Sequence, residues 1–498
     1  MTPAAAVSLA PATLAAIAET VPTPRYDRDR LNVGIVHFGV GGFHRAHQAM
    51  YLDRLMNAGG AFDWAICGVG VMPADRQMRA ALVAQECLYT LIEKHGNGIH
   101  QPRVIGSIID YRYAPDDTAA VIARLVDEAT RIVSLTVTEG GYNVDDVTGE
   151  FLPDTPAVAA DLQPGAVPRT VFGLVTAALA RRRERGLAPF TIVSCDNLPG
   201  NGRIARTAFT AFARMCDPEL GDWVEHEVRF PNSMVDRITP ATTDADRDEL
   251  RARFGIDDRW PVVCEPFVEW VLEDSFSCGR PPYEQAGVRI VDDVTPHERM
   301  KLRLLNASHQ GLGYFGHLCG YTFVHEAAQD PLFQRFLRGY MNREATPTLG
   351  DVPVRDLEEF KQPLIERFSN PEIRDTIARI CTDSSDRIPK FVLPVVRDQL
   401  ARDGELARCA AIVASWARYA EGVDEHGAPI DVVDRQRDRV TALAQRALED
   451  PRVFIADRQL FGDLAEHERF ATAYSAALRS LHERGARATL EATVGMYG

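Results

Sequence analysis

A lysine, an asparagine and a histidine lie within a nine-residue segment in the second half of the sequence: Lys301, Asn306 and His309. On an α-helix, which turns about 100° per residue, Asn306 and His309 are about 60° apart and Lys301 is within about 140° of both. The three side chains can therefore line one concave surface. Asn306 and His309 could then donate hydrogen bonds to an alkoxide or carbonyl oxygen as negative charge develops on it.

The neighbours of Lys301 favour a buried position on a helix. Residues 300, 302, 304 and 305 are apolar, and burial of the amine among them would lower its pKa toward the working range of a general base. Thr295 and Glu298 match a capping box, and Pro296 suits the first helical position. The alternative is an ordinary capped helix whose lysine extends along the surface into water.

A glycine-rich turn in the first half of the sequence has the pattern of a nucleotide-binding loop. An apolar run over residues 31–38 is followed by Gly39 and Gly41, and a helical pattern comes next. A strand, a glycine turn and a helix together present backbone N–H groups to a pyrophosphate. The third glycine of the usual pattern is replaced by His44, so a glycine-rich turn without a ligand is the alternative.

An acidic residue that could contact the cofactor's ribose is expected after the second strand. That strand ends at Val71, and the nearest acid is Asp75, beside Arg76. Asp75 could hydrogen-bond the ribose hydroxyls and repel a 2′-phosphate, whereas Arg76 could accept one. The placement favours NAD over NADP; the alternative is an acid that only begins a helix.

Two further polar clusters follow apolar runs. Asp196 and Asn197 end the run 190–195, and the turn-rich segment 231–237 includes Asp236. Open α/β sheets bind ligands at the carboxyl ends of their strands, although turns are also rich in Asn and Asp. No histidine or cysteine has the spacing of a zinc site, so we expect no metal. There is no Tyr-x-x-x-Lys pattern either, which leaves a metal-independent lysine base.

The elements that must position these residues change in character near residue 290. Before it, continuous apolar runs separated by helical stretches predict a parallel sheet covered on both faces; after it, helical periodicity dominates. We therefore predict an α/β fold with a Rossmann-type, doubly wound sheet domain over residues 1–290, including an N-terminal arm, and a mostly helical domain over residues 291–498. The predicted strands are 31–38, 64–71, 131–138 and 190–195.

Composition narrows the class of protein. The chain has 498 residues and a formal net charge of −15, which disfavours nucleic-acid and anionic-membrane partners. No apolar run reaches the roughly 18 residues of a membrane span, and the first 20 residues lack a targeting pattern. The nine scattered cysteines predict reduced thiols in the cytoplasm.

Five segments together resemble the mannitol dehydrogenase family, the metal-independent, polyol-specific long-chain dehydrogenases. They are residues 38–47, 136–142, 194–197, 231–237 and 301–309. The resemblance runs from about residue 30 to the C-terminus and implies an expanded Rossmann domain, a helical domain and a substrate between them. It implies Lys301 as general base, Asn306, His309 and Asn197 as ligands of the substrate oxygen, and Asp236 and Glu298 as acids that orient the lysine or pass on its proton. For the cofactor it implies Gly39, Gly41, Gly42, Phe43, Asp75 and Arg76.

One segment departs from the mannitol-specific pattern. Arg379 is retained, but Thr382 stands where a histidine often contacts the polyol, and Arg387 replaces a lysine. Because an arginine fork suits a carboxylate, these residues open a hexuronate oxidoreductase of the fructuronate or tagaturonate reductase type as an alternative. The other interpretation is that Arg387 only holds a loop.

Three functions therefore stand at this point. The first is an NAD-dependent dehydrogenase acting at C2 of a linear polyol such as D-mannitol, D-arabinitol or D-sorbitol, with the keto-sugar as product. The second is the hexuronate oxidoreductase, and the third is a non-catalytic NAD(H)-sensing protein that has kept the fold. We expect a monomer, and a homo-oligomer remains an open alternative.

Overall fold

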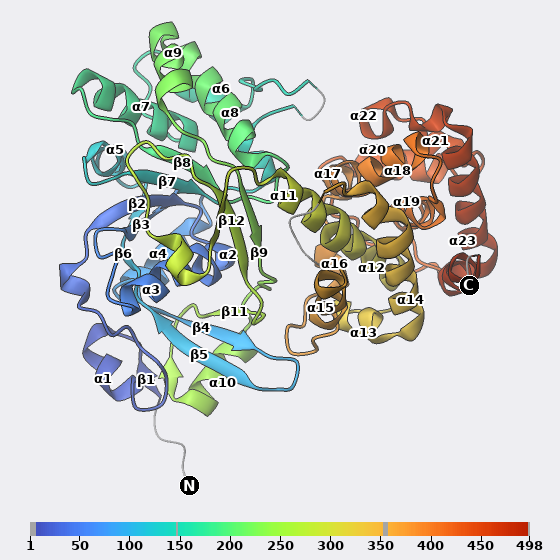
Figure 1. Cartoon of the computed structure of the whole chain (residues 1–498), viewed down its shortest axis with the longest axis horizontal. Coiled ribbons are helices and arrows are strands. Elements are labelled where there is room, and N and C mark those ends of the chain that lie inside the picture. The colour runs from blue at the N-terminus through green and yellow to red at the C-terminus, as the bar shows by residue number, and fades with distance from the viewer. Residues whose placement is uncertain (1–5, 146–147, 352–356, 497–498) are drawn as a thin grey trace. The chain divides into compact units, whose positions relative to one another are not determined.

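The computed structural model describes residues 6–145, 148–351 and 357–496. It divides into two compact units, Met1–Val294 and Thr295–Gly498. Every strand among the described residues belongs to the first unit, and the second unit is built from helices (Figure 1). The predicted fold class, a Rossmann-type sheet domain with a mostly helical domain, is confirmed.

The main sheet of the first unit has five parallel strands. Their order is β6 (Ile108–Tyr113), β3 (Ala65–Gly70), β2 (Val33–Phe38), β7 (Ile132–Leu135) and β8 (Thr191–Ser194). In chain order this is 3-2-1-4-5, the strand order of a dinucleotide-binding fold. The order reverses between β2 and β7, so their carboxyl ends mark the place where such sheets bind ligands.

Helices cover both faces of this sheet, which is why its central strands β3, β2 and β7 are fully buried and largely apolar. Val36 and Phe38 of β2 pack with one group of helices, whereas Ile35 of the same strand packs with another. The first group is α5 (Thr118–Val126), α7 (Val171–Glu184) and α8 (Asn201–Cys216); the second is α3 (Gln48–Asn57) and α4 (Asp75–Val83). The alternation of side chains along β2 thus builds two hydrophobic cores.

Several short strands were not predicted from the sequence. They form small sheets beside the main one: β4 (Tyr89–Lys94) with β5 (His100–Ile105) and β11 (Val262–Cys264), β9 (Ser233–Asp236) with β12 (Glu269–Glu273) and β13 (Arg289–Val291), and β1 (Val7–Ser8) with β10 (Ile256–Asp257). Most are short or carry polar residues, so they lack the long apolar pattern of a central strand.

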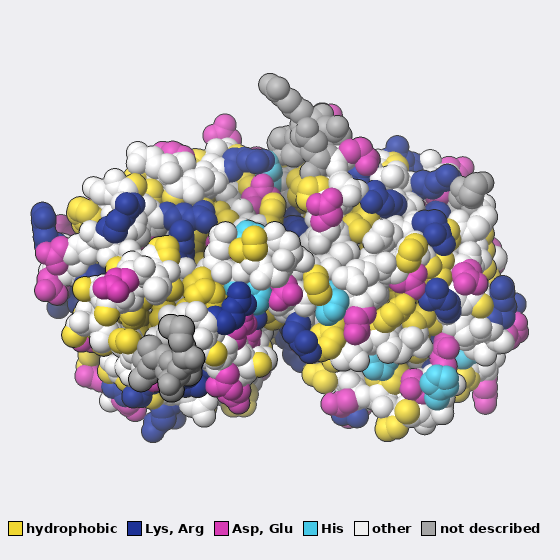
Figure 2. Space-filling view, turned by 90° about the horizontal axis from the view of Figure 1, so that it is seen from below, with side chains coloured by type: hydrophobic (Ala, Val, Ile, Leu, Met, Phe, Trp, Pro, Cys, Tyr) yellow, Lys and Arg dark blue, Asp and Glu magenta, His cyan; other side chains and the backbone are white. Residues whose placement is uncertain are grey.

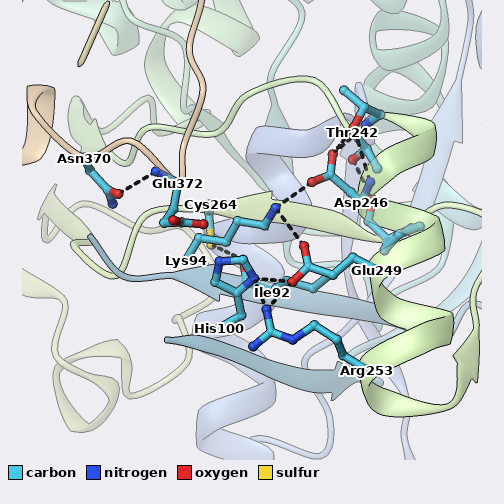
Figure 3. Close-up of polar contacts among 12 residues, drawn as sticks. Ile92, Lys94, His100, Thr242, Asp246, Glu249, Arg253, Cys264, Asn370 and Glu372 are labelled. Carbon is cyan, nitrogen blue, oxygen red and sulfur yellow. Dashed lines mark hydrogen bonds and ion pairs between the residues drawn. The ribbon is translucent and has the colours of Figure 1, made fainter. Parts of the chain in front are cut away.

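Charged side chains join the β4–β5 hairpin to helix α10 (Asp244–Phe254). Lys94 Nζ lies 2.7 Å from Asp246 and 3.3 Å from Glu249, and His100 and Arg253 also contact Glu249 (Figure 3). Lys94 is buried, so its charge needs these carboxylates.

The second unit places its candidate residues on a helix that changes type along its length. The segment predicted as one α-helix is α11 (Thr295–Lys301), a π-helix labelled η5 (Leu302–Asn306) and α12 (Ala307–Leu318). A second π-helix, η6 (Tyr340–Ala345), follows α14 (Pro331–Gly339). The other helices here are α13 (Val324–Gln329), α15 (Glu358–Phe368), α16 (Ile377–Ile380), α17 (Ser384–Phe391), α18 (Leu393–Ala401), α19 (Ala407–Ala420), α20 (Arg437–Arg446), α21 (Arg452–Ile455), α22 (Arg458–Phe461) and α23 (Glu468–Gly495).

The surface mixes charges of both signs. Figure 2 shows acidic and basic side chains interspersed on one face of the molecule. Many pair locally; Arg214, for example, lies 2.8 Å from Asp222 and 2.7 Å from Glu225. Within the described ranges, each helix is too short or too polar to span a bilayer.

Candidate active site

The glycine turn lies at the point where the strand order reverses. Gly39 follows β2 with a φ of +88°, a conformation that glycine adopts without strain. A Cβ atom added to Gly39 would lie 2.1 Å from the carbonyl oxygen of Thr136, which follows β7. Only glycine therefore lets the ends of these two strands approach so closely.

The next glycine, Gly41, leaves the backbone open. Gly41 has an ordinary φ of −93°, and the nearest atom to a Cβ added there is the Gly39 carbonyl oxygen at 3.9 Å. Gly42 begins the short helix α2 (Gly42–Ala46), which also carries Phe43. An open backbone after a tight turn is the arrangement that a dinucleotide's pyrophosphate requires, so these residues fit the predicted cofactor.

A neutral histidine that the sequence analysis did not single out links the two strands. His37 Nδ1 lies 2.8 Å from Ser134 Oγ, and Nε2 lies 3.0 Å from Thr136 Oγ1, whose hydroxyl donates to the Gly39 carbonyl. Nε2 must therefore be the donor and Nδ1 the acceptor. Burial lowers the pKa of His37 to about 3, so the ring holds the turn without a charge. A histidine in an otherwise apolar strand was the signal available in the sequence.

The helical pattern after the glycine turn forms two helices. His47 has φ −126° and ψ −92°, which separates α2 from α3. His47 Nε2 lies 2.9 Å from the carbonyl oxygen of Glu269, and its ring packs on Phe43 and Trp270. These tertiary contacts override the local helical pattern.

Asp75 stands close to the end of β3, at the first turn of α4. Its Oδ2 accepts hydrogen bonds from the backbone N–H groups of Val71 and Met72, at 2.9 and 2.8 Å. Arg76 is exposed and ion-pairs with Asp116 at 3.5 Å. A carboxylate held beside the end of the second strand fits the role of a ribose ligand that repels a 2′-phosphate.

The polar segments after β8 and β9 lie together. Asn201 Nδ2 donates to the carbonyl oxygens of Asp196 and Ser233, which joins segment 194–197 to segment 231–237. The Asp196 carboxylate accepts bonds from the N–H groups of Val137 and Thr138, and thus holds the loop after β7. The two candidates of these segments differ in exposure, since Asn197 is half-buried and Asp236 is buried.

A buried arginine next to Asp236 was missed by the sequence analysis. Arg237 donates to the carbonyl oxygens of Ala46 at 2.7 Å and Glu265 at 2.8 Å, and it ion-pairs with Glu93 at 2.6 Å. It thereby fixes the end of helix α2, the helix that follows the glycine turn. In the sequence, nothing distinguishes Arg237 except its place beside Asp236.

The predicted geometry of Lys301 and Asn306 is corrected by the π-helix. In η5 the N–H of Ala307 bonds the carbonyl of Leu302, five residues back, instead of four. Residues five apart therefore point in more similar directions than they would on an α-helix, and Lys301 and Asn306 are five apart. The separation of about 140° expected for an α-helix does not apply.

Lys301 and its apolar neighbours are buried, as the sequence analysis requires for a general base. The side chains at positions 300, 302, 304 and 305 are all buried, and Lys301 itself is only 6% exposed. Glu298 and Asn306 are buried too, whereas His309 is half-buried and its ring packs on Phe368 at 4.3 Å. No donor among the described residues reaches Asn306 Oδ1, so a bound hydroxyl could satisfy it.

Both arginines of the divergent segment have protein partners. The Arg379 guanidinium makes two hydrogen bonds of 2.5 Å to the Asp375 carboxylate. Arg387 donates to the carbonyl oxygens of Ile380 at 2.9 Å and Arg379 at 3.3 Å, which close helix α16. Thr382 bonds the Arg379 carbonyl at 2.9 Å. These contacts support the interpretation that Arg387 holds a loop.

A groove of about 660 Å³ in the second unit is separate from the candidate residues. It is lined by residues 403–407, Glu468, Arg469, Thr472 and Ala473, and no candidate residue lines it. In the part of the chain that the structure describes, no three His, Cys, Asp or Glu side chains are grouped to hold a metal ion. The groove therefore gives no evidence about the candidate catalytic residues.

Comparisons with known proteins give matches along nearly the whole chain. The family models named mannitol dehydrogenase Rossmann domain and mannitol dehydrogenase C-terminal domain match residues 33–285 and 293–482. Mannitol 2-dehydrogenase of Aspergillus fumigatus is 46% identical over 477 residues, covering 94% of this chain and 95% of that protein. Mannitol dehydrogenase 2 of Saccharomyces cerevisiae is 44% identical over 491 residues, covering 98% and 97%.

Two solved structures are similar over their full length. The ternary complex of Pseudomonas fluorescens mannitol 2-dehydrogenase with NAD and D-mannitol has a TM-score of 0.93 and 45% identity, covering 98% of this chain and 100% of that chain. A substrate-free D-sorbitol dehydrogenase has a TM-score of 0.86 and 40% identity, covering 97% and 100%.

Proposed function

The chain belongs to the mannitol dehydrogenase family, and from this premise we propose which of its residues carry out the reaction and on which substrate. It is an NAD-dependent polyol oxidoreductase. When bound, NAD supplies the acceptor for the hydride that leaves the alcohol carbon. The residues that would hold it are Gly39, Gly41, Gly42, Phe43 and Asp75; Arg76 flanks Asp75.

Lys301 is the general base of the proposal. Its neutral amine takes the proton of the C2 hydroxyl, so that the C–O bond becomes a carbonyl as the hydride departs. Asn306, His309 and Asn197 donate hydrogen bonds to that oxygen while it carries negative charge. Asp236 and Glu298 orient the amine or pass its proton to water.

The scarcity of lysine supports this assignment. Only four of the 55 Lys and Arg residues are lysines, at positions 94, 301, 361 and 390. An arginine could not serve here, because a guanidinium does not release its proton in a protein. Lys94 and Lys361 are ion-paired with carboxylates, at 2.7 Å from Asp246 and 2.5 Å from Glu358. Lys301 lies among buried apolar side chains, the setting that favours a neutral amine.

We propose a neutral polyol, with D-mannitol converted to D-fructose, over a hexuronate. The single observation that carries this choice is the pairing of Arg379 with Asp375, since a guanidinium already bound by a carboxylate is a poor receptor for another. The contacts of Arg387 with backbone carbonyls point the same way. A side-by-side assay of fructose and fructuronate with NADH tests this choice: faster reduction of fructuronate would overturn it.

We further propose that the chain works as a monomer in the cytoplasm. The nine cysteines are free thiols, which suits a reducing compartment. Exposed large apolar side chains are dispersed along the sequence, at positions such as Met72, Val167 and Leu448. Light scattering over a range of protein concentrations, and localisation of a tagged chain in the source cells, test the two statements.

Two substitutions of the lysine test the base. Lys301→Ala is expected to lower kcat for mannitol oxidation by orders of magnitude while NADH still binds, and added methylamine should restore part of the rate. Lys301→Arg keeps a cation but should be inactive and not rescued. Lys361→Arg is the matched control, because Lys361 is equally buried (5% exposed) and needs its charge; its kcat should stay within about twofold of the parent.

The pH profile provides a second readout for the same assignment. Oxidation needs the unprotonated amine, so kcat should rise from pH 6 toward pH 10 in the parent enzyme. A flat profile, or near-normal turnover of Lys301→Ala on mannitol, arabinitol and sorbitol alike, would remove Lys301 as the base. Binding of NADH without turnover of any polyol or keto-sugar would favour the non-catalytic sensor instead.

A further inference from the structure

The π-helix η5 leaves one backbone carbonyl without its usual partner. In an α-helix the N–H of Ala307 would bond the carbonyl of Arg303, four residues back. Here that N–H bonds the carbonyl of Leu302. The Arg303 carbonyl is therefore released, and a buried, unsatisfied carbonyl costs roughly 1–3 kcal/mol. Something must compensate for it if the wide turn is to persist.

Tyr340 provides that compensation from a neighbouring element. Its hydroxyl donates to the Arg303 carbonyl oxygen at 2.8 Å. The side chain is completely buried, and burial raises the pKa of its phenol well above the usual value. The hydroxyl thus remains protonated, and remains a donor, over the whole pH range in which a dehydrogenase works.

The element that presents Tyr340 is itself firmly held. Tyr340 begins the second π-helix, η6, in which Glu344 accepts hydrogen bonds from the N–H groups of Arg408 and Cys409, both at 2.7 Å. Gln399 donates to the carbonyl oxygens of residues 343 and 344. Helices α18 and α19 therefore fix η6, and η6 fixes the position of the phenol.

Arg303 is also held through its own side chain. Its guanidinium lies 2.6 Å from the Asp398 carboxylate and donates to the Thr348 carbonyl at 2.8 Å. Arg303, within the wide turn, is thus tied at its carbonyl by Tyr340 and at its side chain by two other segments. Wide turns of this kind are frequent at functional sites.

We propose that Tyr340 is a positioning residue, whose hydrogen bond to the Arg303 carbonyl keeps the turn wide and so aligns Lys301 with Asn306. Without this donor, the carbonyl regains a partner if the turn narrows to an α-helix. That change would move Lys301 and Asn306 from the same side of the helix to about 140° apart. The inference rests on the proposed roles of Lys301 as base and Asn306 as ligand of the substrate oxygen.

The test removes the hydroxyl and keeps the ring. Tyr340→Phe is expected to lower kcat for mannitol oxidation at least tenfold, with the NADH dissociation constant within twofold of the parent. The pH at which kcat reaches half its maximum should also shift, because the amine no longer has the same neighbours. A merely structural role would lower the melting temperature without moving that midpoint in the folded enzyme.

Tyr474→Phe is the matched control. Tyr474 is also completely buried in the second unit, and its hydroxyl meets no hydrogen-bond partner among the described residues. Its removal should leave kcat and the pH midpoint unchanged. Placing 4-aminophenylalanine at position 340, which keeps an N–H donor on the ring, should restore most of the lost kcat.

A second variant covers the case in which Tyr340→Phe does not fold. Arg303→Gln loosens the same turn from its partly exposed side chain and should lower kcat in the same direction, by a smaller factor. If Lys301→Ala is inactive while both turn variants keep kcat and the pH midpoint of the parent, the positioning inference is wrong and the proposed base stands. If Lys301→Ala is fully active, the proposed function itself fails.

Discussion

Gly41 offers the sharpest test of the cofactor site, because the protein without a ligand has room for a methyl group there. The backbone at Gly41 has φ −93°, and the nearest atom to an added Cβ is 3.9 Å away. Gly41→Ala should therefore leave the free energy of unfolding unchanged or raise it by up to about 1 kcal/mol, since alanine restricts the unfolded chain. Any loss of function must then come from a ligand that lies against this backbone.

The expected loss is in NAD affinity. A pyrophosphate that approaches the Gly41 backbone would meet the new methyl group, and we expect the dissociation constant for NADH to rise at least tenfold, or about 1.4 kcal/mol. Titration of NADH fluorescence measures this, and thermal unfolding of the apo protein measures stability. If Gly41→Ala binds NADH within twofold of the parent, the open side of this turn does not face the cofactor.

Gly39→Ala is the contrasting variant. Its φ of +88° costs an L-residue about 1–2 kcal/mol, and the added Cβ would lie 2.1 Å from a backbone oxygen that cannot move independently. It should lower the melting temperature even without cofactor. Gly39 is thus expected to be required for stability and Gly41 for binding of NADH. If the two variants had the same melting temperature and the same NADH affinity, this distinction would be wrong.

Two further predictions concern the same unit. Asp75→Ala should raise kcat/KM with NADP relative to NAD at least tenfold, because it removes the carboxylate that repels a 2′-phosphate; steady-state kinetics with both cofactors measures the ratio, and an unchanged ratio would contradict the role. His37 should make the fold acid-labile: its pKa is lowered to about 3, so the unfolded chain takes up the proton first as pH falls below about 6.5, and up to about 5 kcal/mol of stability is lost by pH 3. Urea unfolding between pH 7 and 4 measures this slope, which should flatten in His37→Asn; an equal slope in both proteins would refute it.

The sequence predicts well where long patterns repeat. The apolar runs at residues 31–38 and 64–71 contain the observed strands Val33–Phe38 and Ala65–Gly70, because a strand buried on both faces needs an unbroken apolar run. The glycine turn and the lysine helix are recognisable for a related reason, since their chemistry requires fixed residue types at fixed spacing.

The sequence fails where a tertiary contact decides the local geometry. The apolar residues between Lys301 and Asn306 suit an α-helix and a π-helix equally, and the hydroxyl that bonds the wide turn comes from Tyr340, 39 positions away from Lys301 in the printed sequence. The break at His47 depends on the Glu269 carbonyl. The pairing of Arg379 with Asp375 is different, because the two are only four residues apart and the sequence analysis overlooked a local pair.

The wide turn over residues 302–306 also bears on how this segment can change in evolution. A substitution of an apolar residue between Lys301 and Asn306 leaves the contacts of Arg303 and Tyr340 in place, so those side chains can be exchanged without loss of register. Deleting a single residue there would leave an ordinary α-helix in which the lysine and the asparagine are four residues apart, about 40° from each other, so the pair would stay on one face. A descendant of this chain could therefore lose the extra residue and the wide turn together and keep the alignment, whereas losing the wide turn alone would separate the pair.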